Sequence, residues 1–113
     1  MTPKQYLKKI EYMIFSHGGI IKKQKNEFRP PTYAMLTPLG EMQITPYDDF
    51  IAIRFVGDLT LAQSYFGRNT MDFGFHNGKW NVQGVQRKGK TASEYRETMF
   101  KLLTCKLKEV TNI

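Results

Sequence analysis

Three strand-like segments follow one another with very short connections between them. They span residues 32–37, 41–45 and 50–56, and only Pro38–Gly40 and Pro46–Asp49 separate them. Apolar and polar residues alternate in the middle segment, which is the pattern of a half-buried strand. A parallel crossover needs a dozen or more residues, so connections this short allow only antiparallel neighbours. The sequence therefore predicts an antiparallel sheet built from local hairpins.

Further strand candidates flank this group. The segments Met71–Phe75 and Lys79–Gln83 are expected to form a last hairpin, because Asn77–Gly78 between them is a strong signal for a tight turn. Nearer the N-terminus, Ile20–Ile21 is a candidate for a short strand that passes into a basic, polar loop ending at Pro30–Pro31. Loops of this kind often carry function.

Two amphipathic helices are expected at the ends of the chain, over residues 3–17 and 92–110. Apolar residues recur in both at helical spacing, and the segments Thr2–Gln5 and Thr91–Glu94 each match a capping box. A short helix is expected over residues 59–66, between the two groups of strands.

These elements predict a single α+β domain that covers residues 1–113 in the order α-β-β-β-α-β-β-α. The expected architecture is one antiparallel sheet of four to five strands, with the N- and C-terminal helices packed on one face. A chain of 113 residues with 41% hydrophobic content is large and apolar enough to bury one core.

Positive charge is concentrated at the two ends of the chain. The total is +7, and the net charge is +5 over residues 1–29, −3 over residues 30–78 and +5 over residues 79–113. Such asymmetry is typical of a surface that faces a polyanion, although solvated, lysine-rich helix faces give the same pattern. If the terminal helices lie side by side, the two basic segments meet in space. The predicted phosphate contacts are Lys22, Lys23, Lys25, Arg29, Arg87, Lys88 and Lys90.

The segment Gly84–Thr91 fits G-x-x-x-x-G-K-[ST], the phosphate-binding loop of nucleotide hydrolases. Its surroundings do not fit, because the preceding strands are joined by hairpins and Asp58 is the only candidate for the magnesium-binding aspartate of such a fold. We therefore expect no nucleotide hydrolysis. A weaker grip on a nucleic-acid phosphate by Gly89 and Lys90 stays open, as does a simple turn followed by a helix cap at Thr91.

Other residues with chemical potential give weaker signals. Trp80 has two interpretations, a platform on which a base stacks or, preferably, a core side chain. Arg54 interrupts an apolar strand, so it is either a surface charge or a covered cation that needs an acidic partner or a ligand phosphate. His17 and His76 have no partners at ligand spacing, and we expect no metal, cofactor or catalytic residue.

Cellular location is constrained by what the sequence lacks. No apolar run approaches the roughly 20 residues of a membrane helix, and the first residues do not resemble a signal peptide. Cys105 is the only cysteine, which favours a reducing compartment, and its apolar neighbours in the last helix suggest an inert, small hydrophobic side chain. We expect a cytoplasmic protein with no membrane partner.

Two segments resemble small phage- or prophage-encoded proteins of unknown function. They are PLGEMQITPYDDFIAIRF (Pro38–Phe55) and NGKWNVQG (Asn77–Gly84), which together with their surroundings cover about half of the chain. The resemblance implies a mobile-element accessory protein that acts in a host bacterial cell, where interference with host defence or nucleic-acid metabolism is a reasonable function.

Three functions are consistent with these observations. The first is a non-enzymatic module that binds DNA or RNA through its basic surface. The second is an inhibitor that binds a host defence protein, as anti-CRISPR proteins do, or a replication protein, and its candidate anchors are Phe28, Tyr33, Tyr47 and Phe50. The third is a nucleotide-binding protein that uses the loop-like motif. The oligomeric state is left open.

Overall fold

The computed structural model describes residues 1–48, 50–57, 60, 64, 73–76, 79–82 and 89–112. For 57, 73–76 and 79–82 it describes the backbone alone. The elements are α1 (Pro3–Ser16), β1 (Ile20–Lys23), β2 (Thr32–Thr37), β3 (Gly40–Pro46), β4 (Ile51–Gly57), β5 (Phe73–His76), β6 (Lys79–Val82) and α3 (Ala92–Thr111).

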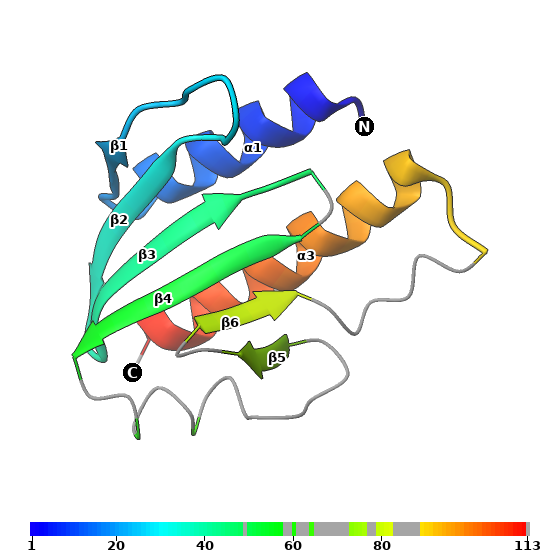
Figure 1. The fold of residues 1–113 in the computed structure, drawn as a ribbon. Helices are drawn as coiled ribbons and strands as arrows, with labels where there is room; N and C mark the ends of the chain where they lie inside the picture. The colour runs from blue at the N-terminus through cyan, green and yellow to red at the C-terminus, as the bar shows by residue number, and fades with distance from the viewer. Residues whose placement is uncertain are drawn as a thin grey trace.

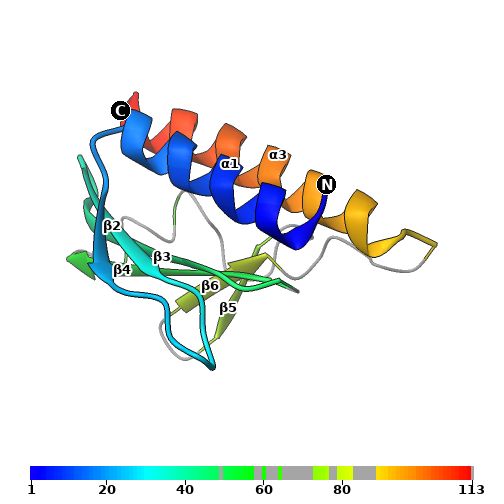
Figure 2. The same cartoon turned by 90° about the horizontal axis from the view of Figure 1, so that it is seen from above.

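In the part of the chain that the structure describes, one antiparallel sheet forms a layer of the molecule, and the helices α1 and α3 form the other. The strand order is β1-β2-β3-β4-β6-β5, with antiparallel pairing throughout this series. Helices α1 and α3 lie side by side on one face of the sheet and run in the same direction (Figures 1 and 2). The predicted α+β class, antiparallel sheet and one-sided helices are confirmed.

The sheet has six strands where four to five were predicted. The additional strand is β1, which pairs with β2 through Ile20 with Ala34 and Ile21 with Tyr33 before the register shifts ahead of Lys23. Two apolar residues followed by lysines form too short a pattern for a firm prediction, so the partner strand decides whether this segment pairs. Edge strands that carry lysine are common because the charge discourages pairing with another chain.

The register gives the sheet two different faces. Tyr33, Ile44 and Ile53 are consecutive partners across β2, β3 and β4, and all three are fully buried. The next row along the sheet contains Gln43 and its partner Arg54, whose side chain is exposed. Because successive side chains of a strand point to opposite faces, one face is apolar under the helices and the other is polar and open.

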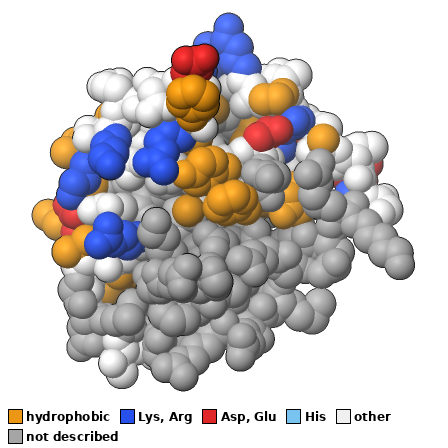
Figure 3. Space-filling view, viewed as in Figure 1, with side chains coloured by type: hydrophobic (Ala, Val, Ile, Leu, Met, Phe, Trp, Pro, Cys, Tyr) orange, Lys and Arg blue, Asp and Glu red, His pale blue; other side chains and the backbone are white. Residues whose placement is uncertain are grey.

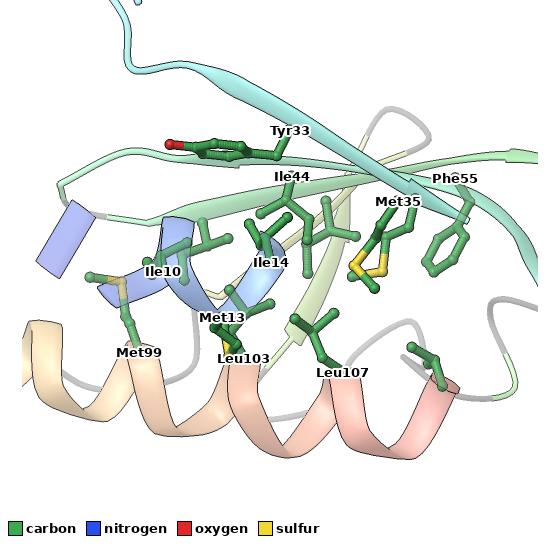
Figure 4. Packing of buried hydrophobic residues seen from close by; sticks show 14 of the residues in the cluster. Ile10, Met13, Ile14, Tyr33, Met35, Ile44, Phe55, Met99, Leu103 and Leu107 are labelled. Atoms are coloured by element: carbon green, nitrogen blue, oxygen red, sulfur yellow. The ribbon is translucent and has the colours of Figure 1, made fainter. Parts of the chain in front are cut away.

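The helices cover the apolar face with their own stripes. Figure 4 shows Ile10 of α1 and Leu103 of α3 packed with Ile44 of β3. Each of these residues is fully buried, and Met99 and Leu107 extend the same stripe along α3. Burial of about 25 cal/mol for each Å² of apolar surface is the main favourable contribution to such a fold.

The predicted helix caps are present. At α1, the Thr2 side chain accepts a hydrogen bond from the Gln5 amide while the Gln5 side chain accepts one from the Thr2 amide, so the capping box is complete. At α3, the Thr91 hydroxyl accepts from the Glu94 amide and also donates to the Glu94 carboxylate. These contacts satisfy backbone N–H groups that have no partner inside a helix.

Two glycines turn the chain from α1 into β1. Gly18 has a φ of 82°, a conformation that other residues rarely adopt. Gly19 packs so closely that a Cβ there would lie 2.3 Å from Ile14 Cγ2 and 2.9 Å from the Ile14 carbonyl oxygen. The pair therefore sets the angle at which the sheet begins under the helix.

Some predictions fall partly or wholly outside the described residues. Of the helix expected over 59–66, the structure describes Thr60 and Ser64, and the Asn77–Gly78 turn is not described. The Cys105 side chain, which was expected to be a small hydrophobic group near apolar residues, is exposed. Within the described ranges, neither α1 nor α3 is both long and apolar enough to cross a membrane.

Candidate nucleic-acid interface

Four basic side chains from three parts of the chain surround one hollow on the open face of the sheet. They are Lys22 and Lys23 of β1, Arg29 of the following loop and Arg54 of β4. The hollow has a volume of about 140 Å³, which is room for a few water molecules or one phosphate group. Figure 3 views this face and shows lysine and arginine side chains gathered over its β1 and β2 side.

The hollow exists because its floor is made of small side chains. Thr32, Thr45 and Ala52 line it, and Thr45 and Ala52 are direct partners across β3 and β4. The Thr32 and Thr45 hydroxyl oxygens lie 2.9 Å apart and share a hydrogen bond. Short residues in the floor and long basic residues around it leave a recess with hydroxyl groups below and positive charge above.

One acidic side chain lies beside this recess. The Glu41 carboxylate accepts hydrogen bonds from Gln43 Nε2 at 2.8 Å and from Lys22 Nζ at 2.9 Å. These hydrogen bonds, with that from Gln43 first, hold the pKa of Glu41 below its ordinary value, so the carboxylate stays charged. Within the part of the chain that the structure describes, Lys23, Arg29 and Arg54 make no ion pair, so the recess keeps a positive excess.

A larger, more apolar groove adjoins the recess. It has a volume of about 610 Å³ and runs between the start of α1, the loop Lys25–Pro30 and the turn Pro46–Asp48. Arg29 and Tyr47 line both the groove and the recess, so the two are neighbours. Lys4 and Lys25 bring positive charge to the groove, and Glu27 and Asp48 bring negative charge to it.

The loop that borders the groove is held by its own hydrogen bonds. Asn26 Oδ1 accepts from the backbone N–H groups of Phe28 at 2.8 Å and Arg29 at 3.0 Å. The Asn26 amide donates to the Arg29 carbonyl oxygen at 3.1 Å. Asparagine commonly fixes a turn in this way. Here the turn presents Phe28, which is 87% exposed, beside Arg29.

Tyr47, which lines the groove, is one member of an aromatic pair. The Tyr47 and Phe50 rings are stacked, with centroids 4.7 Å apart and an angle of 22° between their planes. The Tyr6 hydroxyl of α1 donates a hydrogen bond to the Tyr47 carbonyl oxygen at 3.2 Å. This bond fixes the turn after β3 against the helix layer.

The predicted phosphate contacts do not form a single group. Lys22, Lys23 and Arg29 come together around the recess, and Lys25 lies in the adjoining groove. Lys90 is exposed but lines neither of them. The recess lies at β1, whereas α3 begins at the opposite end of the molecule (Figure 1). Arg87 and Lys88 lie outside the described residues. The two terminal helices do lie side by side, yet Lys90, the described member of the C-terminal set, lies apart from Lys22, Lys23 and Arg29.

The motif Gly84–Thr91 is described only from Gly89 onward. Gly89 has a φ of 78°, as a turn residue does, and Thr91 caps α3. The preceding strand β6 pairs antiparallel with both β4 and β5, whereas a P-loop follows a strand of a parallel sheet. For Trp80 of β6, the Cα lies opposite that of the buried Ile53, while its side chain lies outside what the structure describes.

Sequence reasoning missed one residue of the recess and misjudged another candidate. Arg54 was noticed as a break in an apolar strand, but only the register of β1 to β4 brings it to Lys22, Lys23 and Arg29. Tyr33 is not an exposed anchor as predicted, because its side chain is fully buried beneath α1. Alternation with its buried neighbour Met35 was the signal that could have placed it.

Comparisons with other proteins give no assignment for this site. No protein-family model, curated protein or solved structure matches the chain. Among the residues that the structure describes, there is no group of histidine, cysteine and acidic side chains suited to a metal ion.

Proposed function

We propose that this protein is a non-enzymatic module that binds nucleic acid through the open face of its sheet. The observation that carries the proposal is the meeting of Lys22, Lys23, Arg29 and Arg54 around one recess. These four residues come from β1, the next loop and β4, so the fold has to assemble them. Backbone phosphates are the groups that such clusters of lysine and arginine bind most often.

The surroundings favour a polymer over a single small anion. Lys4 and Lys25 line the groove beyond Arg29, together with the acidic residues Glu27 and Asp48, so cations are present in both hollows. A chain of phosphates can contact these charges in succession, and each contact releases bound counterions. The total charge of +7 supports the same interpretation.

Fluorescence anisotropy with labelled DNA and RNA oligonucleotides at low salt tests this proposal. We expect binding that weakens as salt rises, and the variant Arg54→Gln should bind more weakly and lower the slope of log K against log salt by about one. Lys101→Gln is the matched control, since it removes the same charge from an exposed position on α3, on the other layer of the molecule.

Two results would count against the proposal. One is the absence of any DNA or RNA binding at low salt. The other is an equal loss of affinity in Arg54→Gln and Lys101→Gln, because binding would then follow total charge and not the recess.

A host protein is the second candidate partner, and one observation favours it. Leu36 and Val56 are 81% and 49% exposed and lie in one row of the open face, on either side of Glu41. Together with the resemblance to phage and prophage proteins, this favours an inhibitor of a host defence or replication protein. Pull-down from bacterial lysate after nuclease treatment, with Leu36→Asp as the comparison, tests it: a partner kept by the protein and lost by the variant is expected.

Nucleotide binding at Gly84–Thr91 is the third candidate. Our proposal predicts no rise in melting temperature when ATP or GTP is added at millimolar concentration with magnesium. A ligand that binds the folded state must raise that temperature, so a clear shift would restore this candidate.

A further inference from the structure

We infer that the nucleic acid bound by this protein is single-stranded, with one phosphate in the recess and an adjoining base in the groove beside Phe28. This inference rests on the proposed function and names its substrate class. It follows from the two residues that the hollows share, from the different chemistry of the hollows and from the hydrogen bonds that hold the loop between β1 and β2.

The size and polarity of the recess suit a phosphate, and those of the groove suit a base. The recess is small and polar, with Lys22, Lys23 and Arg54 around it. The groove is larger, about 610 Å³, which lies within the range of about 300–1,000 Å³ common for small-ligand sites. Its wall includes Phe28 and Tyr47, whose rings can contact the flat face of a base.

Arg29 joins the two hollows. It lines both of them, and the turn closed by Asn26 places it directly beside Phe28. A guanidinium next to an exposed aromatic ring suits a nucleotide, because the cation pairs with the phosphate while the ring stacks on the base. The hydrogen bonds of the turn mean that less order has to be gained on binding.

A duplex does not satisfy this arrangement. Its bases are stacked and paired in the interior, so a base can enter the groove only after it leaves the stack, which costs free energy. In a single strand the bases can turn outward and stack on aromatic side chains. Phe28, which is 87% exposed, is then the residue through which the protein binds single-stranded nucleic acid in preference to a duplex.

The test compares three labelled probes of equal length by fluorescence anisotropy. They are oligothymidylate, the same strand without bases, and a duplex. We expect oligothymidylate to bind more tightly than the other two. Phe28→Ala should weaken oligothymidylate binding by about tenfold, which corresponds to the stacking of one base, and should leave the strand without bases unchanged.

Two further variants keep the result interpretable. Phe28→Trp retains an aromatic ring and should keep the affinity for oligothymidylate. Tyr12→Ala removes an aromatic ring that is 78% exposed on α1 and lines neither hollow, so it should change nothing. Both Phe28 and Tyr12 are exposed, so these substitutions leave the core intact, and circular dichroism checks that they fold.

The inference and the proposed function fail in different ways. Equal affinity for the strands with and without bases, tighter binding of the duplex, or an equal effect of Phe28→Ala on both single strands would overturn the inference and leave nucleic-acid binding in place. Absence of binding to all three probes at low salt would overturn the proposed function itself.

Discussion

The Tyr33 hydroxyl of β2 donates a hydrogen bond to the Glu11 carboxylate of α1 at 2.5 Å. Tyr33 is fully buried, and its ring also makes an edge-to-face contact with Phe15, with centroids 5.9 Å apart. A buried phenol needs a partner for its O–H group, and here that partner lies on the other layer of the fold. The pair therefore ties the first helix to the sheet close to β1.

We expect Tyr33→Phe to lower the free energy of unfolding by about 1 kcal/mol near neutral pH. The loss is modest because Glu11 is only half-buried, so water can replace the missing donor. Urea unfolding measures the difference. Tyr12→Phe removes the hydroxyl of a mostly exposed residue on α1, the helix that carries Glu11. A comparable loss of stability in that variant would contradict this account.

The stability difference between wild type and Tyr33→Phe should depend on pH. Burial first, and then the hydrogen bond and charge of Glu11, raise the pKa of Tyr33 above its ordinary value of 10.0. The stability that Tyr33 contributes is therefore complete below pH 10 and is lost as pH rises above that value, by up to about 1.4 kcal/mol per pH unit. The gap between wild type and Tyr33→Phe should close within roughly one unit above pH 10.

Local signals in the sequence predicted most of the elements, but they did not predict how distant elements meet. Each of these signals spans only a few neighbouring residues: short connections, alternation of polar and apolar residues, and capping residues. For this reason β2, β3, β4 and both long helices lie close to their predicted bounds. The strand β1 depends on its pairing with β2, which no local pattern fixes. The recess depends on the same pairing, so its cations were recognised one by one, and the role of its fourth member, Arg54, was left open.

Gly19 offers a sharp test of how α1 passes into β1. A Cβ there would meet the Ile14 side chain and, at 2.9 Å, the Ile14 carbonyl oxygen, which belongs to the backbone and cannot move aside easily. We expect Gly19→Ala to lower the free energy of unfolding by about 1–3 kcal/mol through overpacking. Thermal and urea unfolding give the value.

Gly18→Ala serves as the comparison for this clash. Gly18 has a positive φ but open space around the Cβ position, so its substitution reports backbone strain alone, about 1 kcal/mol. If Gly19→Ala proved as stable as wild type, the close approach of Gly19 to Ile14 of α1 would be refuted.

Arg96 joins α3 to the turn after β3. Its Nε lies 2.7 Å from Asp48 Oδ1 and its second terminal nitrogen lies 3.1 Å from Asp48 Oδ2, while the first donates to the Met1 carbonyl oxygen at 3.1 Å. Because Asp48 is exposed, we expect Arg96→Ala to lower the free energy of unfolding by only about 1 kcal/mol.

Two variants isolate the fork geometry of this contact. Arg96→Lys keeps the charge but cannot bind both carboxylate oxygens, so it should lose most of the same stability. Glu109→Gln breaks the 3.1 Å pair with Lys106 one turn away on α3, which should cost no more than about 0.5 kcal/mol. Full stability of Arg96→Lys would show that charge alone matters at this position.

Glu41 gives a prediction of increased binding. Its carboxylate is the acidic group paired with Lys22 beside the recess, at 2.9 Å, so it competes with an incoming phosphate for that lysine. We expect Glu41→Gln to raise the affinity for oligonucleotides a few-fold and to steepen the salt dependence, since Lys22 then becomes available for a phosphate. Glu109→Gln removes an acid from a similar lysine pair on the helix layer and should have little effect.

The pH dependence of this effect follows from the pKa of Glu41. Hydrogen bonds from Gln43 and Lys22 hold that pKa below its ordinary value of 4.5, so Glu41 opposes phosphate binding at neutral pH and is neutralised only in acid below that value. The ratio of the two affinities, Glu41→Gln to wild type, should therefore stay constant from neutral pH down to about pH 4.5. Below that pH the two affinities should converge. Equal affinity of the two proteins at neutral pH would show that Lys22 does not contact the bound strand.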